Sequence, residues 1–214
     1  GALDSLKAAL SLDMKEGTGD PALLSASAEL NANEHSLTLV ALRGTWRGGT
    51  LALDGPASIA YGSDLSVQHL AAHLGGGIVT VSGSLSPKLA LQAKLQGVKL
   101  EDFPRLMPTV APRGTLSADI ALSGTLEAPI GHIAFKGEGL RAAATGNGTP
   151  PAVVTADIAL ADGNADIDAA IRAGTAADLV LKGRSPLAAD QAMALHAQGR
   201  LDLALFDPLL VPGG

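Results

Sequence analysis

Apolar residues alternate with polar or small residues along most of the chain. In 116–126, leucine, alanine, isoleucine and glycine hold every second position, and mostly serine, threonine and aspartate stand between them. Similar runs occupy 6–14, 24–32, 89–95, 154–160, 165–171, 179–181, 193–197 and 201–205. Because successive side chains of a strand point to opposite faces, each run has one apolar and one wet face. That pattern is typical of antiparallel sheets.

A helical interpretation has to be weighed, because the alanine-rich runs have fair helix propensity. Two observations oppose it. The chain contains 26 glycines, and no run repeats apolar residues at the i, i+3, i+4, i+7 spacing of an amphipathic helix. The sequence therefore predicts an all-β protein whose strands are mostly antiparallel.

Turn signals separate the runs and divide the chain into hairpins. Asp54-Gly55, Asn147-Gly148 and Asp162-Gly163 suit two-residue hairpin turns, whose central residues need positive φ. The alternation breaks near 101–108, where we expect a short helical interruption with Asp102 as its N-cap. The stretch 206–210 looks like a second such turn. We otherwise expect one continuous β segment over 1–214, cut from a longer chain.

The composition indicates an interior of small aliphatic side chains. Hydrophobic residues make up 47% of the chain, but only 2% of all residues are aromatic. Since aromatic rings supply much of the buried area of ordinary cores, we expect either a thin core or a cavity lined by aliphatic side chains. The net charge of −6 argues against nucleic acid as a partner. The chain has no cysteine, which excludes disulfides and thiolate chemistry.

The residues that carry catalytic or metal chemistry do not form a convincing motif. His69 and His73 have the spacing of zinc ligands on a helix, but on a strand they lie about 13 Å apart. The run 162–166 begins like a calcium loop and lacks the later glycine and glutamate. Trp46 suggests a strand-end aromatic, with a membrane or partner anchor as the alternative. We predict no enzyme activity, no metal and no cofactor.

Four segments resemble the C-terminal region of the TamB family, within the AsmA-like superfamily. They are LEDFPRL at 100–106, RGTLSAD at 113–119, LSGTLEAPIG at 122–131 and GRLDLALFDP at 199–208. The resemblance is strongest over 75–140 and weaker over 190–210. It implies a long antiparallel sheet curled into a U-shaped trough, the β-taco, with an apolar interior. It also implies a location in the periplasm, in a parent protein anchored in the inner membrane outside this segment.

The resemblance implies a conduit that moves phospholipid between the inner and outer membranes alongside the outer-membrane barrel TamA. Two alternatives remain: a scaffold for nascent outer-membrane β-barrel strands, and an inert β-solenoid or adhesin stalk. The expected partners are phospholipid acyl chains or those nascent strands. From the apolar phase of each run, we predict that the trough is lined by Leu91, Leu95, Leu116, Ile120, Leu122, Ile158, Ile167, Ile171, Leu195 and Leu203.

Overall fold

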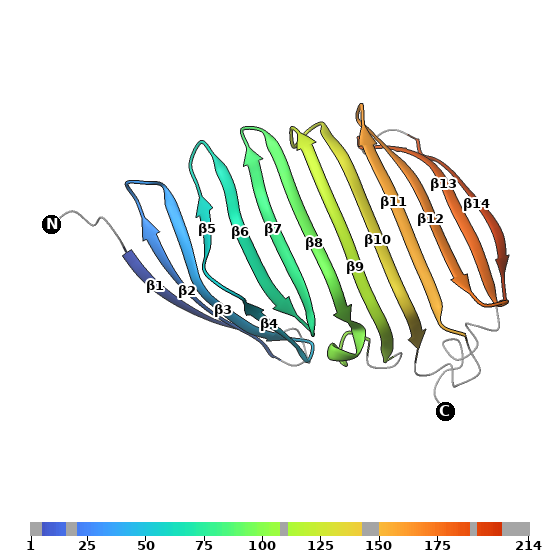
Figure 1. Ribbon diagram of the computed structural model, residues 1–214, viewed down its shortest axis with the longest axis horizontal. Helices are drawn as coiled ribbons and strands as arrows, with labels where there is room; N and C mark the ends of the chain where they lie inside the picture. Colours follow the sequence, from blue (N-terminus) through green and yellow to red (C-terminus); the bar gives the residue numbers. More distant parts are fainter. Residues whose placement is uncertain (1–5, 16–20, 108–110, 143–149, 189–191, 203–214) are drawn as a thin grey trace.

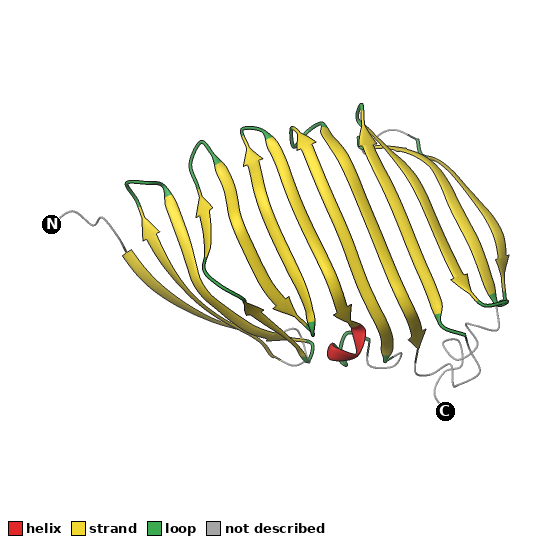
Figure 2. Cartoon of the chain, viewed as in Figure 1, coloured by secondary structure: helices red, strands yellow, loops and turns green. Residues whose placement is uncertain are grey.

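The chain forms a single β-sheet, which confirms the predicted all-β class. The computed structural model describes residues 6–15, 21–107, 111–142, 150–188 and 192–202. Within these ranges the chain forms fourteen strands and one short 3-10 helix (Figures 1 and 2). Across the same ranges, no helix has the length and apolar character needed to cross a membrane.

The strands follow one another along the chain with short connections. They are β1 (Leu6–Lys15), β2 (Pro21–Asn31), β3 (Ser36–Trp46), β4 (Gly49–Leu53), β5 (Ala57–Ala60), β6 (Leu65–Leu74), β7 (Gly77–Ser86), β8 (Leu89–Lys99), β9 (Pro112–Gly124), β10 (Pro129–Ala142), β11 (Ala152–Ala161), β12 (Asn164–Ala173), β13 (Ala177–Pro186) and β14 (Ala194–Leu201). The 3-10 helix, η1, is Leu100–Asp102.

The sheet is an antiparallel meander in which almost every strand pairs with its neighbours in sequence. Its order is β1-β2-β3-β4-β6-β7-β8-β9-β10-β11-β12-β13-β14, and β5 pairs with β3 and β6. Figure 1 shows that the sheet curls along its length instead of lying flat. The predicted curled antiparallel sheet is therefore confirmed. Both faces and both edges of this sheet are available to define a functional surface.

Two-residue turns with positive φ join several strands. Asp162 and Gly163 have φ of 50° and 70° and connect β11 to β12, as predicted. Gly75 and Gly76 join β6 to β7 in the same way. The prediction for Asp54-Gly55 is wrong: this pair separates β4 from β5, which both lie between β3 and β6. Asn147-Gly148 lies outside the described residues.

The helical interruption is shorter than predicted and begins one residue earlier. Its single 3-10 turn ends at Asp102, and Lys99 occupies the N-cap position without a side-chain hydrogen bond. Asp102 therefore does not cap the helix. The predicted run 116–126 is also too long, because β9 ends at Gly124 and Leu126 is exposed in the following turn. The expected turn at 206–210 lies outside the described residues.

Phe103, which directly follows η1, is the only aromatic side chain among the buried residues of the described ranges. It is 5% exposed and makes an edge-to-face contact with Trp46. Gly49 and Gly75 leave the space that its ring occupies, since a Cβ atom at either position would overlap the ring. Gly49 shares a face with Leu51, two residues along β4. Phe103 thus joins two hairpins to the β8–β9 connection at one end of the sheet.

We expect Phe103→Ala to lower the free energy of unfolding by about 3 kcal/mol, because it removes the largest buried side chain from a site that two glycines keep open. Urea denaturation followed by circular dichroism measures this change. Met107→Ala is the matched control, because Met107 is 53% exposed. Its loss should stay near or below about 0.5 kcal/mol. Equal losses in the two variants would contradict the packing role of Phe103.

Candidate functional site: an open apolar sheet face

One face of the sheet carries apolar residues that line up across the strands. Directly paired residues form a first row from β6 to β14, called here the isoleucine row: Leu70, Val81, Ala93, Ile120, Ile133, Ile158, Ile167, Gly183 and Leu195. Since adjacent strands lie about 4.8 Å apart, this row is roughly 38 Å long. Aliphatic side chains from eight of these nine strands therefore form a strip along the long axis of the sheet, and Gly183 is the one member without a side chain.

Two further rows run beside the isoleucine row on the same face. The alanine row comprises Ala72, Val79, Leu95, Ala118, Phe135, Ala156, Ala169, Leu181 and Ala197. The valine row comprises Val98, Leu116, Gly137, Val154, Ile171, Leu179 and Gly199. Residues two apart in a strand share a face, so the three rows together form one broad apolar surface.

The nine predicted lining residues that the structure describes all lie on this face. Four are in the isoleucine row: Ile120, Ile158, Ile167 and Leu195. Leu95 lies in the alanine row, and Leu116 and Ile171 lie in the valine row. The remaining two, Leu91 and Leu122, are paired directly with each other in a fourth row. Leu203 lies outside the described residues.

The sequence prediction missed Ile133 and Phe135 in the centre of this face. Their strand, β10, reads PIGHIAFKGEGLRA, where only these two large apolar residues alternate with polar or small ones. A two-member run is too short to reveal a strand phase by itself. Their pairing partners supply the missing signal, because Ile133 pairs with Ile120 and Phe135 with Ala118.

The apolar face is open, because nothing else in the described part of the chain covers it. Every described strand belongs to the same sheet, and the strands that contact one another extensively are all sheet neighbours, so no second layer packs against this face. Nine apolar residues are buried in the described ranges, five of them alanine, and no large side chain is fully buried. Most row members are half-buried, and Ile171 and Leu195 are 41% and 37% exposed. The predicted interior is therefore thin and accessible.

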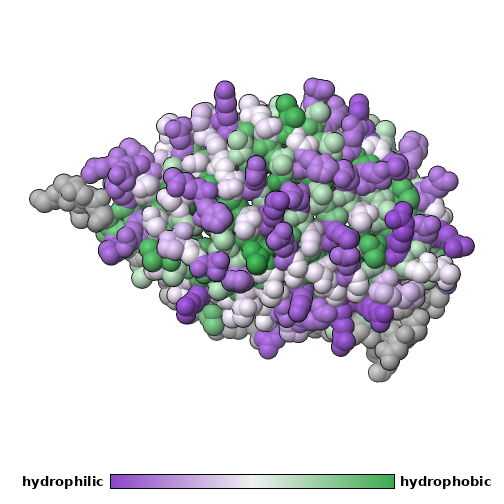
Figure 3. Space-filling model, viewed as in Figure 1, coloured by the Kyte–Doolittle hydropathy of each residue, from purple (hydrophilic) through white to green (hydrophobic). Residues whose placement is uncertain are grey.

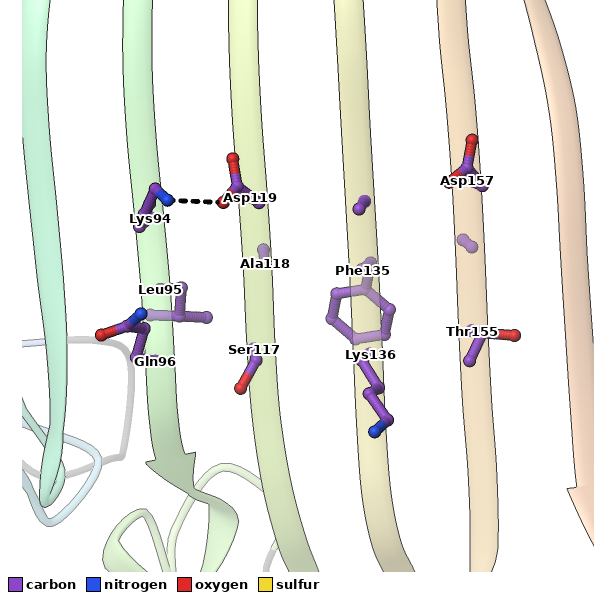
Figure 4. Close-up of a pocket in the computed structure, with 12 residues that line it drawn as sticks. Lys94, Leu95, Gln96, Ser117, Ala118, Asp119, Phe135, Lys136, Thr155 and Asp157 are labelled. Carbon is purple, nitrogen blue, oxygen red and sulfur yellow. Dashed lines mark ion pairs between the residues drawn. The ribbon is translucent and has the colours of Figure 1, made fainter.

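A hollow of about 570 Å³ lies at the middle of the sheet, on β8 to β11. Its lining includes Leu95, Ala118, Phe135 and Ala156 of the alanine row, where large and small residues alternate. Figure 4 shows Ala118 between Leu95 and Phe135 on neighbouring strands. The other lining residues all belong to the opposite, polar phase of the same strands, so the hollow is not confined to the apolar face: Lys94, Gln96, Ser117, Asp119, Ala134, Lys136, Thr155 and Asp157.

The opposite face is polar and carries cross-strand ion pairs. Lys94 contacts Asp119 at 3.0 Å, and Arg184 donates two hydrogen bonds to Asp166 at 2.7 and 2.8 Å. The hydrogen bonds from Arg184 lower the pKa of the Asp166 carboxyl below its usual range. Hydrophilic side chains spread over the whole face seen in Figure 3, among smaller hydrophobic patches. Opposite charges on paired positions favour the observed register.

Residues that the sequence suggested as metal ligands instead have partners in pairs of this kind. Asp166 and Asp168, which follow the Asp162-Gly163 turn, pair with Arg184 and Lys182 on β13. His73 lies 3.3 Å from Asp54, and both side chains are exposed. In the described ranges, no group of three or more histidine, aspartate or glutamate side chains could hold a metal ion.

Trp46 stands at the end of β3, where the sequence suggested a strand-end aromatic. Its ring packs edge-to-face against Phe103, with 6.4 Å between centroids. The guanidinium of Arg47 lies 5.7 Å from the centroid of the indole ring. Trp46 therefore covers the packed cluster at this end of the sheet, while nearly half of its surface stays exposed.

The fold and the apolar face can be compared with known proteins. No protein-family model, curated protein or solved structure matches this chain. The resemblance to the TamB family therefore stays a prediction from the sequence.

Proposed function

We propose that the apolar face binds the acyl chains of phospholipids, and that the chain is one segment of a hydrophobic conduit between the inner and outer bacterial membranes. The observation that carries this proposal is the set of aliphatic rows, which run uncovered from β6 to β14. Exposing an acyl chain to water costs about 0.8 kcal/mol per methylene. Contact with an aliphatic strip offsets that cost along the whole path.

The chemistry of the rows suits transport better than tight storage. Their members are mainly alanine, valine, leucine and isoleucine, which attract a hydrocarbon without directional bonds. The ion pairs lie on the opposite face, as Lys94 and Asp119 illustrate. A chain on the apolar face therefore meets few polar groups that would hold it at one place. The periplasmic location and the partnership with TamA belong to this same proposal.

Site-specific photo-crosslinking tests the proposal at two adjacent positions of β9. Ile120 lies in the isoleucine row, and Asp119 lies on the opposite face with Lys94. A photoreactive amino acid at position 120 should give phospholipid adducts in cells, because its side chain faces the bound hydrocarbon. The same probe at position 119 should give few. Adducts identified by mass spectrometry in equal yield at both positions would refute binding on the apolar face.

A scaffold for nascent outer-membrane strands is the second candidate, and the edge of β14 favours it. Within the described residues, β14 pairs only with β13, and Ala194 to Arg200 are all exposed. An edge strand offers unpaired backbone groups that can bind an extended chain. The crosslinking experiment separates the two candidates when the probe is also placed at Gln198. Peptide adducts there, without lipid adducts at position 120, would favour the scaffold.

A further inference from the structure

Two arginines face each other across neighbouring strands at one end of the sheet. Arg113, the second residue of β9, pairs directly with Arg141 of β10, and both side chains are exposed. Like charges on directly opposed positions are destabilising. Within the described registers, this is the only pair of arginines or lysines placed opposite each other.

Several other cations of the sheet face acids directly, among them Lys94 and Arg184. Arg172 and Arg200, on the same end of the sheet, both pair with Asp178 of β13. In the one cross-strand pair of acids within the described registers, Asp157 lies 3.2 Å from His132, and Asp168 forms an ion pair with Lys182. The acidic pair therefore contacts basic side chains, and the pair of arginines is the exception to this arrangement.

No acid neutralises the arginine pair among the described residues. Neither Arg113 nor Arg141 forms an ion pair there. The neighbouring carboxylate of Glu101 accepts a hydrogen bond from the backbone N–H of Gly114. The segments 108–110 and 143–149, which adjoin the two strands, contain no acidic residue. Neither the described residues nor these two segments therefore supply a counter-charge to the arginine pair.

We propose that Arg113 and Arg141 bind the phosphodiester group of an anionic phospholipid at the rim of the apolar face. Guanidinium groups match phosphate oxygens in charge and in bidentate geometry. This inference rests on the proposed function, because the lipid's chains then lie on the apolar face. Leu140 links the arginine pair to the apolar face. It precedes Arg141 and packs over Gly137 of the valine row, close to Leu116.

The position at the end of the strands allows this arrangement. Arg113 and Arg141 lie on the polar side, in the same phase as Thr115 and Ser117 of β9. β9 begins at Pro112 and β10 ends at Ala142, so only one residue separates each arginine from the strand end. A lipid held by its phosphate there passes around the rim, and its chains reach Leu140 and Leu116 on the other side.

The test compares two soluble lipids that carry the same chains. Dioctanoyl phosphatidylglycerol has the phosphodiester, and dioctanoylglycerol lacks it. We expect Arg113→Gln/Arg141→Gln to weaken binding of phosphatidylglycerol by about tenfold, through loss of two charged donors, and to leave binding of dioctanoylglycerol unchanged. The matched control is Arg172→Gln/Arg200→Gln, which removes the same charge from arginines that face Asp178. It should change neither affinity by more than about twofold. Calorimetric titration of the wild-type chain and both double variants with each lipid measures all six affinities.

Three results would overturn the assignment. Equal weakening by both double variants would mean that only overall charge matters, and no weakening by either would mean that the arginines bind no lipid. Displacement of phosphatidylglycerol by glycerol 3-phosphate at equal concentration would identify a soluble phosphate ester as the ligand instead. Failure of the proposed function itself is distinguishable, because the wild-type chain would then not bind dioctanoylglycerol.

Discussion

Gly131→Ala is expected to lower the free energy of unfolding by about 3 kcal/mol, through backbone strain and steric overlap together. Gly131 has φ of +153°, a conformation that residues with a side chain rarely adopt. A Cβ atom there would overlap the backbone carbonyl oxygen of Ala121 on β9. Because that oxygen belongs to the neighbouring strand, the overlap is relieved only by separating β9 from β10 at the centre of the sheet.

Two control variants separate these contributions. Gly55→Ala adds a methyl group where no atom lies within 4 Å, and it should change stability by about 0.5 kcal/mol or less. Gly97→Ala also meets no atom within 4 Å but has φ of +66°, so it should lose about 1 kcal/mol from strain alone. Urea denaturation followed by circular dichroism should show the largest loss of stability for Gly131→Ala, a smaller one for Gly97→Ala and the smallest for Gly55→Ala. A Gly131→Ala midpoint equal to that of Gly97→Ala would show that the sheet adjusts to the added methyl group.

Ile120→Gln/Ile158→Gln should weaken binding of a fluorescent fatty acid by roughly thirtyfold, taking about 1 kcal/mol for each altered contact. Ile120 and Ile158 lie on either side of Ile133 in the isoleucine row. The substitution removes aliphatic contact area and forces an acyl chain to displace water from two amide groups. The expected loss is therefore larger than for any change on the polar face.

The matched control places the same two glutamines on the opposite face. Ala121 and Ala159 are exposed, lie on either side of His132 and each follow one of the isoleucines in the chain. Ala121→Gln/Ala159→Gln should leave the affinity for the fatty acid within about twofold of wild type. Fluorescence titration measures both, and far-UV circular dichroism checks that both variants keep their strands. Equal weakening would contradict a binding surface confined to one face.

Much of the candidate site was predictable because a strand phase is a local property. Leu116, Ile120 and Leu122 are separated by even numbers of residues, and side chains at such separations share a face. The same reasoning places Ile158 and Ile167 on the apolar faces of their own strands without reference to the partner strands. The pairing of these two residues with each other agrees with both assignments.

The local rule fails where a bulge changes the phase. In β8 the pairing shifts between Leu95 and Val98, so an odd separation returns Val98 to the apolar face beside Leu116. Gly97, with φ of +66°, lies within this bulge. A single extra residue in a strand leaves no clear trace in an alternating sequence, because its effect depends on the partner strand. Val98 is 4% exposed, but the alternation ending at Leu95 gave no reason to expect this.

The sequence by itself determined that the chain is all-β and which residues of each strand form its apolar phase, because alternation acts over neighbouring residues. Only the tertiary structure decided how the phases align into rows, since alignment depends on register between strands. It also decided two spatial arrangements that no sequence motif predicts. Phe103 packs over Gly49 and Gly75, and Arg113 faces Arg141. In both cases the residues are distant in sequence and close in the folded chain. The energy of each interaction depends on the distance between the side chains, which only the fold sets.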